Sequence, residues 1–317
     1  MGSPVRRARL AFLLAPLALA CAHARADTYF LTVAGLGGEP DYEQRFRELA
    51  ADLDRIWRGT GAASHVYTLS GPAATRAQIA STMETIAHAA HPQDDFVLVL
   101  IGHGSDDGVE YKVNLPGPDL SARALAALCD RIHTDRQLIV NTTSASGGSI
   151  AALARRGRAV IAATKSGTEK NATVFARFFV DALEDPTADV DKSRTITALE
   201  AFEYASAKTA AFYQSQQRLA TEHAVFEDRG RGTPVRAVAQ DSEEGRLLAS
   251  LVLTRFASGS SPALDPAKRG LLVEKQQLEQ RIDELKYRRA AMSAEDYKRE
   301  LTAALVALAK VDEELDR

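Results

Sequence analysis

Residues 96–104 read FVLVLIGHG, and residues 138–148 read LIVNTTSASGG. Each stretch begins with a short apolar run that contains β-branched residues, which is typical of a strand buried on both faces of a parallel sheet. Each run then gives way abruptly to small and polar residues. Side chains just past the carboxyl ends of parallel strands line the crevice in which such folds hold their sites. We therefore expect His103 and Ser144 to emerge at the same edge of one sheet.

The rest of the chain alternates between strand-like and helix-like segments. Strands are predicted at residues 28–34, 65–69, 96–101, 138–140 and 159–163, with a short hairpin strand at 109–113. Helices are predicted at residues 41–57, 75–90, 121–132, 150–155, 175–183 and 197–217. A loop is predicted at residues 222–234, followed by an apolar element of undetermined type at 246–256. This alternation indicates an α/β fold with a parallel sheet and right-handed crossovers.

The composition is that of an ordinary globular protein, with 317 residues of which 45% are hydrophobic and 26% are charged. This length is enough for one sizeable core and an appendage. The formal net charge of −3 gives no basic footprint, so no nucleic acid partner is expected.

The first 26 residues are predicted to be a signal peptide rather than part of the fold. Arginines precede an apolar run at residues 10–20, which is too short to span a membrane, and Ala24-Arg25-Ala26 resembles a cleavage site. The protein is therefore expected to be exported, either periplasmic or secreted. The alternative is a lipoprotein anchored at Cys21, the one case in which a membrane is an expected partner. Cleavage after Ala26 leaves only Cys129, so no intramolecular disulfide is expected.

The C-terminal part of the chain has a different texture. Residues 27–257 are predicted to form the α/β domain, residues 258–267 a linker, and residues 268–317 a coiled-coil-like helical hairpin. Leucines and isoleucine form one apolar seam on each predicted helix, at 271, 278, 282 and 285 and at 301, 305, 308 and 315. The hairpin is expected to pack on the domain, to bind a partner, or to mediate self-association.

Two glycines flank His103, and they favour a functional site over a purely structural histidine. They allow a ligand backbone to approach closely, and they leave the Gly104 N–H available as a donor. Three stretches together, FVLVLIGHGSDDG (96–108), YKVNLPGPDLSARAL (111–125) and LIVNTTSASGG (138–148), resemble the caspase-like cysteine peptidases, including their legumain (peptidase C13-like) relatives. The resemblance spans roughly residues 28–228 and implies a caspase-like parallel-sheet sandwich flanked by helices. It makes His103 the counterpart of the catalytic histidine and places Ser144 where the family has its nucleophilic cysteine.

That serine changes the expected chemistry. A cysteine thiol, with a pKa near 8.5, is partly ionised at neutral pH, whereas a serine hydroxyl needs a general base that is usually oriented by a third group. No carboxylate can be assigned to His103 from the sequence, although Asp106 and Asp107 follow it closely. We therefore expect a pseudo-peptidase that binds a peptide or protein ligand. The enzyme alternative is a hydrolase in which Ser144 and His103 form a dyad and the Gly104 and Ser144 N–H groups are the oxyanion donors. A structural envelope protein, for which the crevice is irrelevant, is a third alternative.

Two further segments carry predicted binding residues. Lys165 and Ser166 follow the strand at 159–163, and the resemblance places this loop beside the substrate groove, where the lysine favours an acidic ligand; the alternative is a solvated loop. Residues 189–200 have the spacing of an EF-hand calcium loop, with candidate ligands Asp189, Asp191, Ser193, Thr195, Thr197 and Glu200. Arg194 stands where such loops carry glycine. The alternative for this segment is a capping box formed by Thr197 and Glu200.

Overall fold

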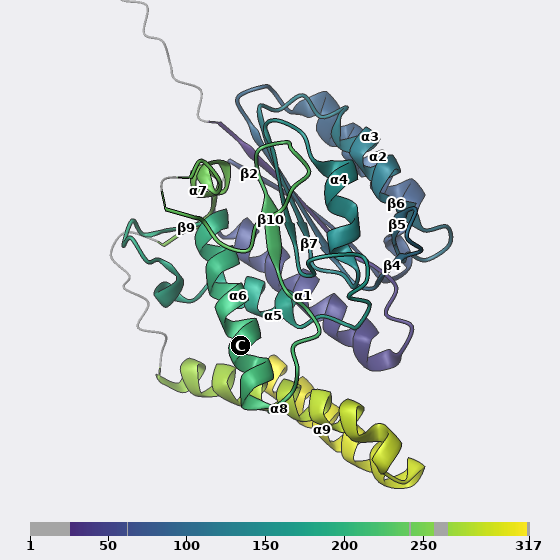
Figure 1. The fold of residues 1–317 in the computed structure, drawn as a ribbon. Coiled ribbons are helices and arrows are strands. Elements are labelled where there is room, and N and C mark those ends of the chain that lie inside the picture. Colours follow the sequence, from purple (N-terminus) through teal and green to yellow (C-terminus); the bar gives the residue numbers. More distant parts are fainter. Residues whose placement is uncertain (1–25, 62, 241, 257–265, 316–317) are drawn as a thin grey trace, which may run out of the picture.

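The computed structural model describes residues 26–61, 63–240, 242–256 and 266–315 (Figure 1). The predicted signal peptide, Cys21 included, therefore lies outside the described residues apart from Ala26, and most of the predicted linker does too. Within the described part of the chain, no helix combines the length and apolarity needed to cross a bilayer.

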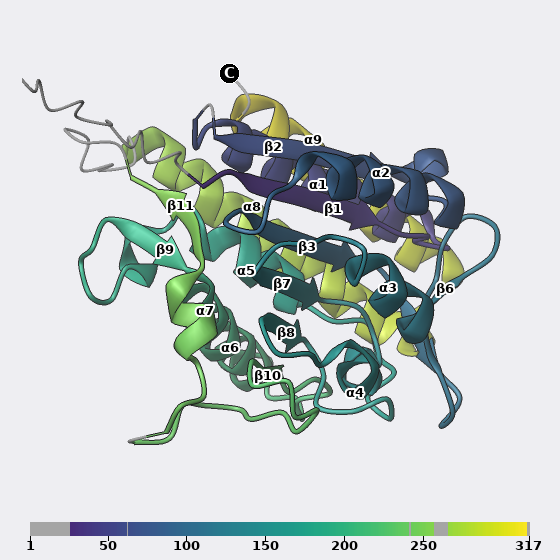
Figure 2. The ribbon, with the colours of Figure 1, turned by 90° about the horizontal axis from the view of Figure 1, so that it is seen from above.

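One six-stranded sheet forms the centre of the molecule, in the order β10-β8-β7-β3-β1-β2 (Figure 2). Its strands are β1 (Thr28–Ala34), β2 (Ser64–Ser70), β3 (Asp95–Ile101), β7 (Arg136–Asn141), β8 (Arg158–Ala162) and β10 (Val225–Glu227). Neighbouring strands are parallel except for β10, which pairs antiparallel with β8 at the edge. Every residue of β3 is buried, as its continuous apolar run predicts. The predicted α/β class is confirmed.

Helices cover both faces of this sheet (Figure 1). On one face lie α1 (Pro40–Arg58), α5 (Phe175–Ala182) and α6 (Ala198–Ser215), and on the other lie α2 (Arg76–Ala89), α3 (Ala122–Cys129) and α4 (Ile150–Leu153). Alternate side chains of β3 enter the two cores, with Val97 and Val99 on the α1 side and Leu98 and Leu100 on the α3 side. The period of two along the strand thus gives two separate hydrophobic layers.

Shorter elements complete the domain. A three-stranded ribbon consists of β4 (Gly104–Asp106), β5 (Tyr111–Val113) and β6 (Leu120–Ser121), and a two-stranded ribbon pairs β9 (Thr195–Thr197) with β11 (Val252–Arg255). The apolar element predicted at 246–256 is helix α7 (Arg246–Ser250) followed by β11. The prediction of a loop over residues 222–234 was wrong at 225–227, because β10 completes the main sheet there. Single helical turns lie at η1 (Gly71–Ala73), η2 (Ser146–Ser149) and η3 (Pro186–Ala188).

The C-terminal hairpin is formed by α8 (Pro266–Arg288), the turn η4 (Arg289–Ala291) and α9 (Ala294–Leu315). Helix α8 thus begins two residues before the predicted boundary. The hairpin has its own small apolar cluster, made of Ile282, Leu285, Ala304 and Leu308. It lies across the α1 side of the domain (Figure 1), where ion pairs join it to α1 and its N-cap, among them Lys275 with Asp52 at 3.6 Å and Arg289 with Glu39 at 3.5 Å.

Candidate functional site

The strand order reverses between β1 and β3, so the crevice beyond their carboxyl ends is the topological switch point of the sheet. Two glycines, Gly35 and Gly102, lie where the ends of these strands approach each other. The Gly35 N–H donates to the Ile101 carbonyl at 2.8 Å, and Gly102 has a φ of 146°, which favours glycine. The chain therefore leaves β3 close to the end of β1 and delivers His103 directly to this crevice.

His103 and Ser144 lie at the same edge of the sheet, as the sequence predicts. The register pairs Leu100 of β3 with Asn141 of β7, and each functional residue follows its strand residue by three positions. The backbones also meet beyond the strands, because a Cβ on Gly104 would lie 2.5 Å from the Ser144 carbonyl oxygen. Glycine is thus required beside His103 for this close approach.

The His103 ring is held on the α1 side of the crevice. It packs edge-on against Tyr42, with ring centroids 4.7 Å apart, and against Phe46 at 5.2 Å. Burial is the largest influence on its pKa and lowers it, and the Lys286 ammonium lowers it further, while a hydrogen bond with the Gly37 backbone opposes both. The net effect is a lowered pKa, so the imidazole is neutral at pH 7. Among the described residues, no hydrogen bond joins this ring to Ser144.

Ser144 lies in a tight turn at the end of β7 and is only 2% exposed. The next residue, Ala145, has a left-handed backbone with a φ of 56°, and its N–H donates to the Glu169 carbonyl at 2.8 Å. A non-glycine residue in this conformation carries strain, which surrounding contacts must hold. The turn therefore has a fixed shape that leads directly into η2.

A buried polar network, which the sequence did not predict, supports this turn. The Tyr111 hydroxyl contacts Thr143 Oγ1 and donates to Asn141 Oδ1 at 3.3 Å, and Asn141 Nδ2 donates to Ser149 Oγ at 3.0 Å. Burial raises the pKa of Tyr111 to about 12. Because Tyr111 belongs to β5, the network ties the small ribbon to the end of β7. Tyr111 lies 30 positions from Asn141 in the chain, so no local spacing reveals its part in this network.

The two N–H groups predicted as oxyanion donors are not used by neighbouring strands. The Asn114 N–H donates to the His103 carbonyl at 3.0 Å, which makes Gly104 and Val113 a pair whose own N–H groups face away from each other. The Gly104 N–H thus takes no part in the β4–β5 ladder, and the Ser144 N–H has no acceptor within the described chain. Neither N–H group therefore has an acceptor in the described chain.

The nearby carboxylates of β4 and its turn serve other groups. Asp106 lies over the backbones of Gly148 and Gly167 and accepts the Gly108 N–H at 2.7 Å. Asp107 accepts the N–H groups of Glu110 and Val109, which lower its pKa. Both carboxylates therefore accept backbone N–H groups of their own turn and not the His103 imidazole.

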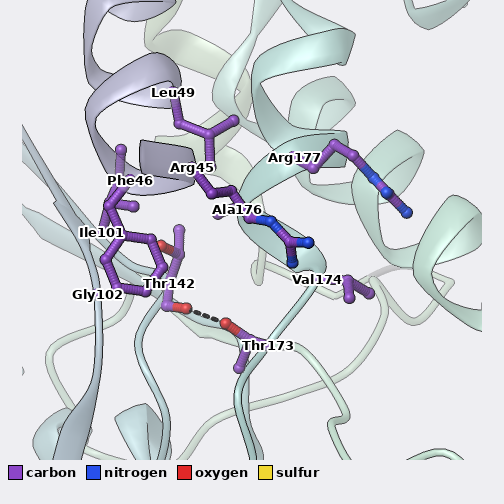
Figure 3. A pocket seen from close by; sticks show the side chains of 10 residues that line it. All are labelled: Arg45, Phe46, Leu49, Ile101, Gly102, Thr142, Thr173, Val174, Ala176 and Arg177. Atoms are coloured by element: carbon purple, nitrogen blue, oxygen red, sulfur yellow. Dashed lines mark hydrogen bonds between the residues drawn. The ribbon is translucent and has the colours of Figure 1, made fainter. Parts of the chain in front are cut away.

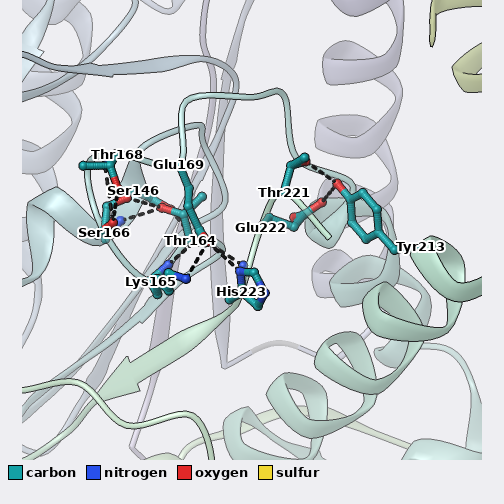
Figure 4. A network of polar contacts seen from close by, with 11 residues as sticks. Ser146, Thr164, Lys165, Ser166, Thr168, Glu169, Tyr213, Thr221, Glu222 and His223 are labelled. Carbon is teal, nitrogen blue, oxygen red and sulfur yellow. Dashed lines mark hydrogen bonds and ion pairs between the residues drawn. The ribbon is translucent and has the colours of Figure 1, made fainter. Parts of the chain in front are cut away.

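The loop after β8 contacts the turn that follows β7, where the Gly147 N–H donates to Thr164 Oγ1 at 2.9 Å, and Figure 4 shows the polar contacts within this loop. Lys165 Nζ lies 3.5 Å from Glu169 Oε1, and Ser166 Oγ lies 2.8 Å from Thr168 Oγ1. Glu169 also pairs with His223 Nδ1 at 2.5 Å. Burial opposes ionisation of Glu169, but hydrogen bonds from the Lys165 N–H and from His223 outweigh it and lower the pKa of Glu169. The sequence identified Lys165 and Ser166 but missed the Glu169–His223 pair, whose members are far apart in the chain.

A small pocket of about 20 Å³ lies between α1 and the start of α5 (Figure 3). Figure 3 shows Arg177 pointing away from this pocket. The volume holds about one water molecule, so the pocket is too small for a peptide side chain. Its lining consists of Arg45, Phe46, Leu49, Ile101, Gly102, Thr142, Thr173, Val174, Ala176 and Arg177.

The predicted calcium loop brings three carboxylates together but also forms the alternative capping box. One oxygen each of Asp189, Asp191 and Glu200 lies within 4.8 Å of the others. Arg194 has a φ of 66°, the left-handed conformation that glycine adopts at this position of an EF-hand. The carboxylates accept local backbone N–H groups, and Glu200 forms the capping box with Thr197. Ser193 Oγ lies 2.8 Å from Thr195 Oγ1.

Comparisons with known proteins find likeness at the level of solved structures only. No protein-family model matches the sequence, and no curated protein does. The similar structures include protein GSU0716 from Geobacter sulfurreducens (13% identity, TM-score 0.45, 74% of this chain and 100% of that one). They also include the initiator caspase Dronc from Drosophila (12%, 0.43, 66% and 82%) and caspase-1 from Spodoptera frugiperda (10%, 0.44, 64% and 86%). These are distant likenesses of architecture, and the α/β class stands on the sheet itself.

Proposed function

We propose that this chain is a caspase-like domain that has lost cysteine peptidase activity and binds a peptide or protein ligand at the edge of the sheet that carries His103 and Ser144. The observation that carries the proposal is the set of contacts that the His103 ring makes, together with the burial of Ser144. The His103 ring is engaged by Gly37, Tyr42 and Phe46, and Ser144 is 2% exposed. A serine in such a site depends on a well-placed general base, and this arrangement supplies it with none in the described chain.

The two carboxylates whose charge raises the pKa of His103 form ion pairs with other residues. Glu39 and Asp41 both act on its pKa, but Glu39 pairs with Arg289 and Asp41 pairs with Lys286. A Ser–His–acid triad needs a carboxylate that orients the imidazole and stabilises its charged form. Here the imidazole contacts a backbone group, and a cation lies nearby. Burial, the largest influence on the His103 pKa, thus opposes the imidazolium that nucleophilic attack by serine would create, and Lys286 adds to this effect.

The crevice retains features that suit a bound peptide. The Gly104 and Ser144 N–H groups have no acceptor in the described chain, so each has a hydrogen bond to give to a carbonyl or carboxylate of the ligand. The same two donors are the observation that favours the alternative, a Ser144–His103 hydrolase, because they are the groups that an oxyanion would need.

The loop after β8 indicates which class of peptide the site would bind. The Lys165 side chain is 53% exposed and favours an acidic peptide. We expect the purified protein to select acidic peptides from a fluorescent peptide library and to bind them more weakly at high salt. Lys165→Glu should weaken this binding, while Lys310→Glu, which makes the same charge change on exposed α9, should leave it unchanged. An equal loss of peptide binding in both variants would mean that only the net charge of the protein matters. A native protein that selects no peptide would refute the proposed function.

A further inference from the structure

The turn of the C-terminal hairpin reaches the first turn of α1, directly beside the candidate site. Lys286 Nζ lies 3.1 Å from the centroid of the Tyr42 ring and forms an ion pair with Asp41. Tyr42 in turn packs edge-on against His103, with ring centroids 4.7 Å apart. A continuous series of contacts therefore links the hairpin to the histidine, across more than 180 residues of sequence.

We propose that Lys286 is a positioning residue of the candidate site: it fixes Tyr42 and Asp41 at the start of α1, and through them it couples docking of the hairpin to the state of the His103 ring. The inference deepens the proposed function, since it concerns the same site and rests on His103 being part of it.

The contact is shielded, which gives it the strength that an exposed ion pair lacks. The Lys286 side chain is 14% exposed, and that of Asp41 is 5% exposed. The ammonium is held between a carboxylate and the face of an aromatic ring, an arrangement in which both attractions act over short distances in a poorly solvated place. Loss of the cation would leave the buried Asp41 carboxylate without this ion pair.

The charged groups that face His103 come from two elements and have opposite effects. Glu39 and Asp41 at the start of α1 favour the protonated imidazole, and Lys286 from α8 disfavours it. Lys286 also neutralises Asp41, as Arg289 does Glu39 at 3.5 Å. Removing Lys286 therefore acts twice in one direction: a like charge is lost, and a carboxylate is released. Docking of the hairpin and neutrality of His103 are linked, so each favours the other.

An NMR titration of His103 in the full chain tests this coupling. The His103 imidazole signal is identified by its loss in His103→Gln, and its midpoint is measured in the native protein, Lys286→Gln and Lys286→Arg. We expect an upward shift of the midpoint in Lys286→Gln and a native midpoint in Lys286→Arg, which keeps the charge. Lys275→Gln is the matched control, because Lys275 joins the same helix to Asp52 at 3.6 Å and Asp312 at 3.0 Å.

Three outcomes overturn the proposal: an unchanged midpoint in Lys286→Gln, an equal shift in Lys275→Gln, or a Lys286→Arg variant that behaves like Lys286→Gln. A thermal melt of each variant shows whether the chain is folded. If Lys286→Gln is not folded, a shifted His103 midpoint in Lys286→Arg would still contradict the proposal. The titration uses no ligand, so a failure to bind peptides leaves it intact, and its own failure leaves peptide binding untouched.

Discussion

Single residues decide how the two halves of the candidate site approach each other. His103 and Ser144 follow strands that the sequence identifies, and their shared edge follows from the parallel order of those strands. Their contacts do not follow from it. Glu39, Asp41 and Lys286 meet at His103 through packing between distant parts of the chain, and the Glu169–His223 pair is formed across 54 positions. Sequence spacing predicts which residues share an edge, whereas long-range packing determines which groups they touch.

Gly104 gives the first prediction. In Gly104→Ala the new Cβ would lie 2.5 Å from the Ser144 carbonyl oxygen and 2.7 Å from both Thr143 Oγ1 and the Tyr111 hydroxyl. These atoms belong to a backbone and to a locked network, so they cannot move away easily. We expect a loss of about 1–3 kcal/mol in the free energy of unfolding, measured by urea denaturation. Gly270→Ala, whose Cβ would meet nothing within 4 Å, should cause no loss.

Glu222 gives a prediction about pH. Burial raises its pKa to about 7, although its carboxylate accepts the Val174 N–H at 2.7 Å and the Tyr213 hydroxyl at 2.9 Å. The folded chain thus keeps a proton that the unfolded chain loses near 4.5, the ordinary pKa of a glutamate. The unfolded state binds fewer protons between these two values, so stability falls as pH rises from about 4.5 to 7.

Glu222→Gln removes that titration. We expect the melting temperature of this variant to fall less between about pH 5 and pH 7.5 than that of the native protein. Glu84→Gln, which removes an exposed carboxylate paired with Arg131, should keep the native slope. A Glu222→Gln variant with the native pH dependence would show that this carboxylate ionises freely in the folded chain.

At the scale of elements, long apolar segments were predictable and short polar ones were not. The strand at Asp95–Ile101 is apolar along nearly its whole length, so its burial on both faces was evident. By contrast, β10 has three residues and ends at Glu227, just before a charged, glycine-containing turn. Glu227 accepts the N–H groups of Arg229 and Arg231, each at 2.9 Å. The residues that shape this turn made the whole segment resemble a loop, and only pairing with β8 makes β10 a strand.

The loop before α6 gives a prediction about calcium. Its three carboxylates already converge, but a metal would have to replace hydrogen bonds that they accept from the backbone. If the loop binds calcium, millimolar calcium should raise the melting temperature by mass action, and Asp191→Asn should abolish the rise. Asp191 is exposed and lies outside the capping box, so this variant keeps the helix start. A native protein whose melting temperature does not respond to calcium would leave the capping box as the whole role of this segment.

At the scale of the whole molecule, the hairpin and the domain have separate apolar cores. The cluster around Leu285 and Leu308 shares no member with the two clusters of the domain, and the described contacts between the hairpin and the α1 region include several ion pairs. We therefore expect a chain that ends after residue 260 to melt cooperatively. Light scattering of the full and shortened chains shows whether the hairpin mediates self-association. A shortened chain that is unfolded would mean that the hairpin completes the core.

The proposed loss of catalysis is tested most directly by a fluorophosphonate probe, which labels activated serines covalently. General-base assistance is typically worth about 10²–10⁴ in rate. Ser144 lacks this assistance, because the described contacts of the His103 ring are with Gly37, Tyr42 and Phe46. We predict that the native protein is not labelled at Ser144 under conditions that label a serine hydrolase completely. Labelling that maps to Ser144 and disappears in both Ser144→Ala and His103→Ala would contradict the account and establish a Ser–His hydrolase.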